Sequence, residues 1–429
     1  MDQKLHIFTS MKQNPTFKIF GAQLPLAIAI AAGLAAPNVA QAESALYISY
    51  RTIPFRIEKD NLELRAARVR IAEAQGRHNQ SGRLTNPVVG AEVSAGRGFR
   101  ERGMTVSLTQ AFPLTKRLSL EKNVTQKDIE LALVEVADVK RRLVGDARQA
   151  LIRFLAISEQ RSLRMEQISL AEELEKSLND AAKKGEVSAL DAGLVSLEVM
   201  QLKTEVRQLE AQIKAINGEI KPLLGLPVEK LVTVGDRFQN LGGINIKRRN
   251  VLARADIKAA QMRIGEAKAR EELERAKKFS DIEVSIFAGL DREEDAPNGF
   301  ENEGIIGIEF SLPLPFWDDN GGNIQEAEAR VWRRRLELDA LTKKAQHEVK
   351  AANDELKEWL ALVKQVDSKL LPAAEKQYQL ANKSYREGLS DIQTVLRSRE
   401  KLLQLRQSRI NALSEFYQAR ARYESALGY

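Results

Sequence analysis

The sequence predicts a mostly α-helical fold with a small β component, written twice along one chain. The pattern Ala-Ala-x-x-Arg-Ile-x-Glu-Ala occurs at residues 66–74 and returns at 259–267. Each copy then runs into two short alternating segments, a very long helical stretch, a Gly-containing turn and a second long helix. An internal repeat of this kind makes one extended body rather than several globular cores.

The first 42 residues have the features of a secretory signal peptide. Three Lys form a basic start, an apolar stretch follows at 19–36, and residues 40–42 fit the small-x-small cleavage pattern. We expect the mature chain to begin near Glu43. The alternative is an uncleaved anchor helix, for which an apolar length of about 18 residues is marginal.

Composition argues against several classes of protein. The chain has no Cys, so disulfides, thiolate metal sites, thiol nucleophiles and a lipid-modified Cys are excluded. Removing residues 1–42 lowers the net charge from +7 to +5, and the basic residues are mixed with acids, which is not a nucleic-acid footprint. No catalytic triad, phosphate-binding loop or metal-binding helix motif occurs, so we expect no enzyme, no cofactor and no bound metal.

The first repeat is expected over residues 43–227. It opens with a helix at about 57–80, followed by a strand pair within 88–112, in which small and apolar residues alternate with polar ones. From 116 to 183 there is no Pro, which predicts a helix about 100 Å long. The hairpin turns near residue 185, and a helix with apolar residues spaced 4-3-4-3 returns.

The second repeat is expected over 251–429, after a less regular connector at 228–250. Its strand pair lies within 281–312, with an acidic loop at Asp291–Glu303. A long helix follows, which Pro372 should kink or break, and the second hairpin turns near residue 388.

These pieces favour a pore. No apolar run after residue 42 reaches 18 residues, so a membrane crossing would have to use strands. Four strands of about nine residues suit an outer membrane but leave open edges, which are costly in lipid. Three copies would give a closed barrel of twelve strands, continuous with a barrel of twelve long helices. The alternative is an ordinary amphipathic sheet packed on helices.

Several local patterns together resemble the TolC family of outer-membrane efflux channels. The run 312–318 (Leu-Pro-Leu-Pro-Phe-Trp-Asp) followed by 320–323 (Asn-Gly-Gly-Asn) resembles the strand-to-helix junction of the metal-cation efflux, CzcC-like branch. Pro372-Ala-Ala-Glu375 with Tyr385-Arg-Glu-Gly388 resembles the approach to the periplasmic tip, and Leu224-Gly-Leu-Pro227 the end of the first hairpin.

The resemblance implies a passive, homotrimeric exit duct in the outer membrane of a Gram-negative bacterium. It implies a periplasmic adaptor and an inner-membrane RND-type transporter as partners, outer-membrane lipid around the strands, and no nucleic acid. Gly185, Gly388 and Tyr385 match the tips that dock the adaptor. Heavy-metal cations are the leading cargo, with drugs or a secreted polypeptide as the alternative. A different class of protein, a periplasmic coiled-coil scaffold without a pore, is the alternative to a channel.

The tips depart from the family pattern at the gate. Where the family's best-known member carries acidic rings, this chain has Thr394 and Arg397; Asp191 is kept, but its basic partner position is Ser390. A pairing of Arg397 with Asp191 or Asp391 is therefore our candidate for a gate, with solvated charges as the alternative.

The polar faces of the predicted strands carry acids and no Lys or Arg. The acids are Glu92, Glu283 and Glu309. If these faces line the lumen, the charge would favour cations.

Overall fold

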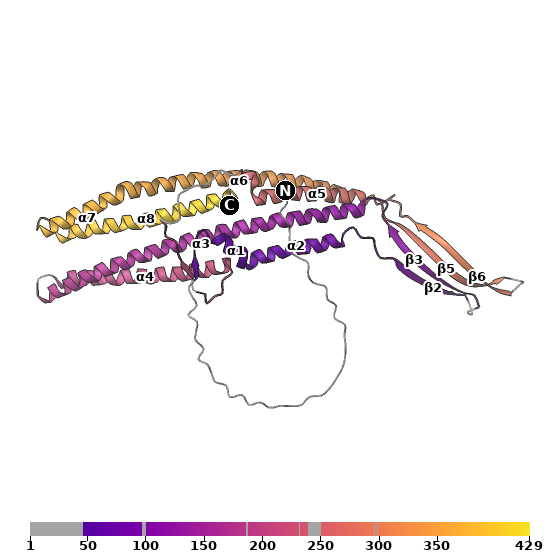
Figure 1. The fold of residues 1–429 in the computed structure, drawn as a ribbon, viewed down its shortest axis with the longest axis horizontal. Helices are drawn as coiled ribbons and strands as arrows, with labels where there is room; N and C mark the ends of the chain where they lie inside the picture. Colours follow the sequence, from indigo (N-terminus) through magenta and orange to yellow (C-terminus); the bar gives the residue numbers. More distant parts are fainter. Residues whose placement is uncertain are drawn as a thin grey trace, which may run out of the picture. The chain divides into compact units, whose positions relative to one another are not determined.

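The computed structural model describes residues 46–429 except 97–99, 186–187, 231, 239–249, 296 and 298. The predicted signal peptide at 1–42 lies outside the described residues. Residues from Ser44 to Tyr429 form one compact unit, in which helices and strands of the two repeats pack on each other. Figure 1 shows their arrangement.

The first repeat contributes three strands, two shorter helices and one long helical hairpin, followed by a strand in the connector. In order these are β1 (Leu46–Ile48), α1 (Ile53–Asp60), α2 (Leu62–Gln80), β2 (Val88–Ala95), β3 (Arg102–Phe112), α3 (Arg117–Lys183), α4 (Ala189–Leu223) and β4 (Val232–Val234). As the absence of Pro predicts, α3 is a single helix of 67 residues. It packs along α4 (Figure 1).

The second repeat follows the same order. Its elements are η3 (Val251–Ala253), α5 (Ala255–Ala276), β5 (Ile282–Asp295), β6 (Gly299–Ser311), α6 (Gly321–Gln365), the π-helical η4 (Val366–Leu370), α7 (Leu371–Arg386) and α8 (Ile392–Ala426). Here α7 packs along α8, and α8 also packs against α3 and α6. The two repeats are therefore joined along their helices as well as through the sheet.

The single opening helix expected at 57–80 is wrong. The helix begins at Ile53 and breaks at Asn61, whose backbone is extended. The Asn61 Oδ1 accepts a hydrogen bond from the Leu64 backbone N–H at 2.7 Å, and its Nδ2 donates to the Leu223 carbonyl at 2.8 Å. The break thus caps α2 and docks it on the end of α4.

Pro372 does not break the helix, and an irregular turn precedes it. Five residues before α7 take the π-helical form, with the Leu371 N–H bonded to the Val366 carbonyl, and Pro372 follows in the first turn of α7. The helix direction continues from α6 into α7 through this irregular turn.

The four strands β2, β3, β5 and β6 form one antiparallel sheet in that order. The first repeat meets the second where β3 pairs with β5, from Arg102 opposite Arg292 to Phe112 opposite Ile282. β2 and β6 are the two edge strands, and the outer side of each is unpaired in the described chain. A separate parallel pair joins β1 to β4 of the connector.

The acidic loop expected at Asp291–Glu303 is also wrong. Most of it belongs to the β5–β6 hairpin, whose pairing extends to Asp295 opposite Gly299. Acidic residues have low strand propensity, and ladder hydrogen bonds from the neighbouring strand override it here.

The largest hydrophobic core lies midway along the helices. It joins residues of α1, α2, α3, α4, α6 and α8 with β1 and Phe238 of the connector. A smaller core holds α3 to α4 nearer their turn, and its members are Ile168, Ala171, Val199, Leu202 and Val206.

Candidate functional site

The sheet has two chemically different faces. On one face the register aligns Val89 with Leu108, Leu108 with Ile286 and Ile286 with Ile308. These side chains are largely exposed, as are Val93, Met104, Leu290, Ile306 and Phe310 on the same face. A continuous exposed apolar surface of this kind marks an interaction with lipid or protein.

The opposite face is polar and hollowed. A hollow of about 530 Å³ is lined by Glu92, Glu283 and Glu309, together with five hydroxyl-bearing residues and Phe287. The hydroxyl-bearing residues are Thr105, Ser107, Thr109, Ser285 and Ser311. The structure therefore brings all three predicted acids to one face of the sheet. A single chain does not enclose a lumen with this face.

Both predicted tips are tight helix-to-helix turns. Gly185 has φ +74° and Gly388 has φ +72°, a region that glycine adopts without a Cβ penalty. Around each, an added Cβ would meet no other atom within 4 Å, so the backbone conformation alone selects glycine. The Gly388 N–H donates to the Tyr385 carbonyl at 3.0 Å, while the Tyr385 side chain is half exposed.

The gate candidates do not assemble into one network in the described chain. Asp391 is the N-cap of α8, and its Oδ1 accepts hydrogen bonds from the Thr394 backbone N–H and Oγ1 at 2.8 and 2.6 Å. These bonds, with the nearby charge of Arg397, hold the pKa of Asp391 below its usual value. Ser390 Oγ donates only to the Asp391 carbonyl, and the side chain of Asp191 lies outside the described atoms.

Arg397 instead lines a groove between the two helical hairpins. The groove has a mixed lining. Its polar members include Arg164 and Gln167 of α3 and Arg399 and Glu400 of α8, and apolar residues such as Leu174 and Leu396 lie among them. One charged contact that crosses from α8 to α3 is an ion pair between Arg406 and Glu166 at 3.3 Å, in which both side chains are well exposed.

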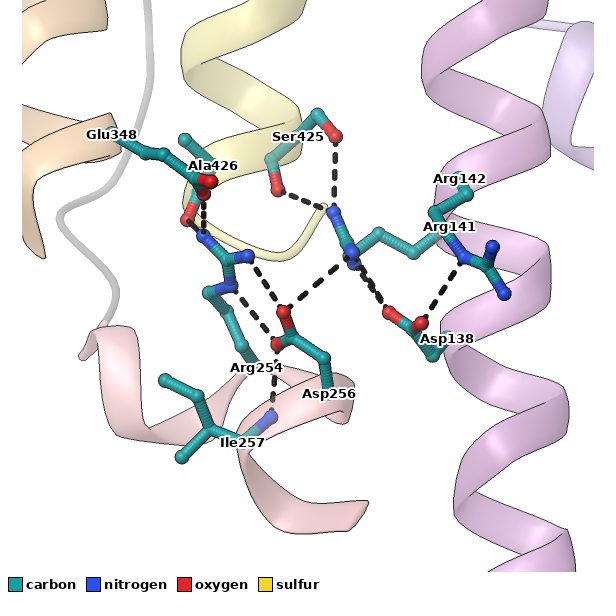
Figure 2. Close-up of polar contacts among 9 residues, drawn as sticks. All are labelled: Asp138, Arg141, Arg142, Arg254, Asp256, Ile257, Glu348, Ser425 and Ala426. Carbon is teal, nitrogen blue, oxygen red and sulfur yellow. Dashed lines mark hydrogen bonds and ion pairs between the residues drawn. The ribbon is translucent and has the colours of Figure 1, made fainter. Parts of the chain in front are cut away.

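Midway along the helices, buried arginines hold the end of α8 (Figure 2). The side chain of Arg254 is 5% exposed, and its Nη1 donates to Glu348 Oε2 at 2.9 Å and to the Ala426 carbonyl at 3.1 Å. Its Nε and Nη2 donate to the two carboxylate oxygens of Asp256 at 3.0 and 2.7 Å. Although burial raises the pKa of Asp256, its bonds to Arg254 lower it below its usual range.

A second arginine comes from the first repeat. Arg141 of α3 donates from Nη1 to the carbonyl and Oγ of Ser425, both at 3.2 Å, and from Nη2 to Asp138 at 2.8 Å. The last carbonyls of a helix lack partners within it and carry partial negative charge, so both arginines satisfy and stabilise this end. We call Arg141, Arg254, Asp256 and Asp138 the equatorial clasp.

Sequence patterns missed a neighbouring buried cluster. The hydroxyl of Tyr50 donates to Glu424 Oε2 at 2.7 Å, and Arg148 and Arg420 donate to the same carboxylate at 2.9 Å. Burial raises the pKa of Tyr50. Tyr50 and Glu424 are 374 positions apart in the sequence, so no local spacing could have indicated their contact.

The connector is fastened by Phe238, which sequence patterns also missed. Its ring stacks on Tyr417 at 5.5 Å, and its carbonyl accepts from the Tyr417 hydroxyl at 2.7 Å. Phe238 is almost fully buried, although it lies in a Gly-containing segment that reads as a loop. A single large aromatic residue in such a segment was the one available signal.

Neither membrane-spanning helices nor metal clusters occur in the part of the chain that the structure describes. No described helix is long and apolar enough to cross a bilayer. No group of three or more His, Asp or Glu among the described residues is arranged to hold a metal ion. Asp318 and Asp319 accept the backbone N–H groups of Asn320 and Gly321, as expected for a turn before a helix.

The chain resembles solved outer-membrane channels over most of its length. A structure of CusC described in terms of transmembrane channel formation covers 90% of this chain and 93% of its own, with 17% identity and a TM-score of 0.70. The outer membrane protein VceC of Vibrio cholerae gives 18% identity, coverage of 88% and 96%, and a TM-score of 0.69. The CmeC outer membrane channel of Campylobacter jejuni gives 14%, 88% and 85%, and 0.72.

Comparison of sequences reaches only the second repeat. The family model described as outer membrane efflux protein matches residues 250–429. No curated protein matches the chain. The second repeat is therefore similar in sequence to the outer membrane efflux proteins, and the chain as a whole has the TolC-like fold of outer-membrane channels.

Proposed function

We propose that three copies of this chain form the passive outer-membrane exit duct of a tripartite efflux system. The observation that carries the proposal is a sheet with one apolar face, one polar face and two unpaired edges, attached to long helical hairpins. Open edges are costly in lipid, and pairing β6 of one copy with β2 of the next would remove them. The efflux-protein match and the channel-like fold support the same conclusion.

In this proposal the apolar face contacts outer-membrane lipid and the helices extend into the periplasm of a Gram-negative bacterium. The tips at Gly185 and Gly388, with Tyr385 beside the second, dock a periplasmic adaptor. An RND-type transporter of the inner membrane supplies the energy. A role of Arg397 with Asp191 or Asp391 at the gate stays a prediction. Thr394 donates to one carboxylate oxygen of Asp391.

Extraction and mass measurement test the duct directly. The mature protein should sediment with outer membranes, require detergent, and have the mass of three chains. Planar bilayers containing it should show discrete conductance steps. A protein that is monomeric and soluble without detergent would instead support a periplasmic coiled-coil scaffold.

The proposed cargo is heavy-metal cations. The junction from Leu312 to Asn323, which resembles the metal-cation efflux branch, supports this choice over drugs or a secreted polypeptide. In a strain lacking the gene, tolerance to metal salts should fall and be restored by the intact chain. Loss of tolerance to drugs, with metal tolerance unchanged, would assign the alternative cargo.

A further inference from the structure

The acidic character of the polar sheet face extends much further than the hollow. Each described strand alternates, so register pairs share a face. Asp291 lies opposite Glu303 and Glu293 opposite Glu301 at the far end of the β5–β6 hairpin. Following the register across the sheet, they share the face that carries Glu92, Glu283 and Glu309.

Basic residues of these strands lie on the other face. Arg102 lies opposite Arg292, and the next pair along the strands is Gly103 opposite Asp291. The two pairs therefore lie on opposite faces of the sheet. The Arg292 guanidinium lies 5.2 Å from the ring of Phe300, which belongs to the same apolar face. Among the strand side chains that the structure describes, the polar face therefore carries seven carboxylates and no Lys or Arg.

This separation of charge is not what sheet stability alone favours. Like charges placed directly opposite each other destabilise a pair of strands, and opposite charges stabilise it. Arg292 sits one residue away from both Asp291 and Glu293, yet alternation directs it to the opposite face. An arrangement that forgoes ion pairing at two successive register positions needs another explanation.

The remaining polar groups on the face suit cations as well. Around Glu92, Glu283 and Glu309, the hollow is lined by hydroxyl groups of Ser and Thr. Carboxylate and hydroxyl oxygens interact favourably with hard cations, whereas no ammonium or guanidinium group of the strands is available to an anion here. A low-dielectric wall behind such a face focuses its field into the adjacent water.

We propose that this face makes the outer part of the duct cation-selective, with Asp291, Glu293, Glu301 and Glu303 concentrating cations at the distal mouth. The inference rests on the proposed function, in which the polar face lines the lumen. It concerns the field of a whole face, repeated in each copy, and not a coordination site. Hydrated inorganic cations are the permeant class that it favours.

Reversal potentials in planar bilayers under a KCl gradient test the inference. The intact trimer should pass K⁺ in preference to Cl⁻ at 0.1 M salt. The preference should shrink at 1 M, where screening shortens from about 10 Å to about 3 Å. Replacing Asp291→Asn, Glu293→Gln, Glu301→Gln and Glu303→Gln should lower the permeability ratio at least twofold. Adding Glu92→Gln, Glu283→Gln and Glu309→Gln should lower it further.

Glu294→Gln is the matched control. This residue neighbours Glu293 but lies on the opposite face, opposite Phe300, so its loss should leave selectivity unchanged. An anion-selective intact channel, or an unchanged ratio after neutralising the polar face, would overturn the inference while leaving the duct intact. Failure to form any channel would instead contradict the proposed function. Should the sevenfold variant not assemble, the pair Glu293→Gln and Glu303→Gln decides the matter.

Discussion

The middle and the tips of the helical region are built on opposite principles. In the middle, helices of both repeats share one large core, and the clasp of Arg141 and Arg254 fixes the end of α8 with buried charges. Toward the tips, α3 and α4 have a small core of their own, and a groove with polar and apolar lining lies between them and α8. Cohesion is concentrated where the repeats join, and it falls off along each hairpin.

The difference indicates that the tips can change conformation at a lower cost in free energy than the middle. Breaking a desolvated ion pair leaves a buried charge without a partner, whereas exposed pairs contribute little. The same type of contact, an arginine bound to a carboxylate, therefore has very different consequences in the two regions.

Removing Arg254 should be the most damaging change. Arg254→Ala removes the donor to the Ala426 carbonyl and the bidentate partner of Asp256, which keeps only a longer ion pair with Arg141 at 3.9 Å and the Ile257 N–H. We expect a loss of about 3–5 kcal/mol in the free energy of unfolding, measured by chemical denaturation in detergent. Arg333→Ala, which removes an exposed pair with Glu337, is the control and should cost under about 1 kcal/mol. Equal losses would remove the distinction between the regions.

Asp256 gives the clasp a pH dependence of known sign. Because its pKa is lowered in the folded chain, its stabilising contribution is present above the unfolded pKa and is lost as pH falls through the folded value. Asp256→Asn should therefore destabilise at pH 7 by less than the loss of Arg254, and the difference from the parent should narrow in acid. Thermal melts between pH 3 and pH 8 measure it. If the stability difference between the parent and Asp256→Asn grew as the pH fell, the lowered pKa of Asp256 would be contradicted.

At the tip, Gly388→Ala should act locally. Its positive φ makes Ala unfavourable by about 1–2 kcal/mol, with no steric contact to add to the cost. We expect faster amide hydrogen exchange near the turn and little change in unfolding of the middle region. Gly265→Ala, inside α5 with equal free space, should stabilise by about 0.5–1 kcal/mol. If both substitutions changed the free energy of unfolding in the same direction, the backbone conformation would not explain the glycine at 388.

Tyr50→Phe probes the buried cluster without breaking it. Glu424 keeps its bonds to Arg148 and Arg420, so removing one hydroxyl should cost about 1 kcal/mol. The exposed Tyr47→Phe serves as control and should be neutral. Denaturant midpoints compare the two, and a neutral Tyr50→Phe would mean that the cluster adds nothing to cohesion.

The smallest effect is expected for the contact between hairpins. Glu166→Ala breaks an exposed pair with Arg406, which keeps its pair with Glu375 of α7, and should change stability by less than about 1 kcal/mol. It should nevertheless raise exchange in α7 and the tip half of α8, since the pair joins α8 to α3. Arg330→Ala, whose partner Glu326 is in the same helix, should leave that exchange unchanged. Protected amides in both variants would mean that the hairpins are held together by other contacts.

Local patterns predicted the regular parts of this fold because their causes are local. The 67-residue α3 follows from an absence of Pro, and the strand pairs follow from alternation. The break at Asn61 could not be predicted, since its amide docks on the end of α4, 162 positions away. The outer part of the β5–β6 hairpin was mistaken for a loop because cross-strand pairing overrode the low strand propensity of its acids.

The candidate site divides in the same way. Alternation along single strands was enough to assign Glu92, Glu283 and Glu309 to one polar face, and glycine spacing was enough to find both turns. The clasp at Arg254 and the cluster at Glu424 depend on contacts between the ends of distant helices. Such contacts have no signature in a local window, because the partners are selected by packing.

Cryo-electron microscopy of the detergent-extracted protein tests the central claim most directly. The account predicts a threefold complex in which β6 of each copy hydrogen-bonds to β2 of the next. Twelve strands would then close around a lumen lined by Glu92, Glu283 and Glu309. Particles in which the two edge strands stay unpaired between copies, or in which the acidic face turns outward, would contradict it.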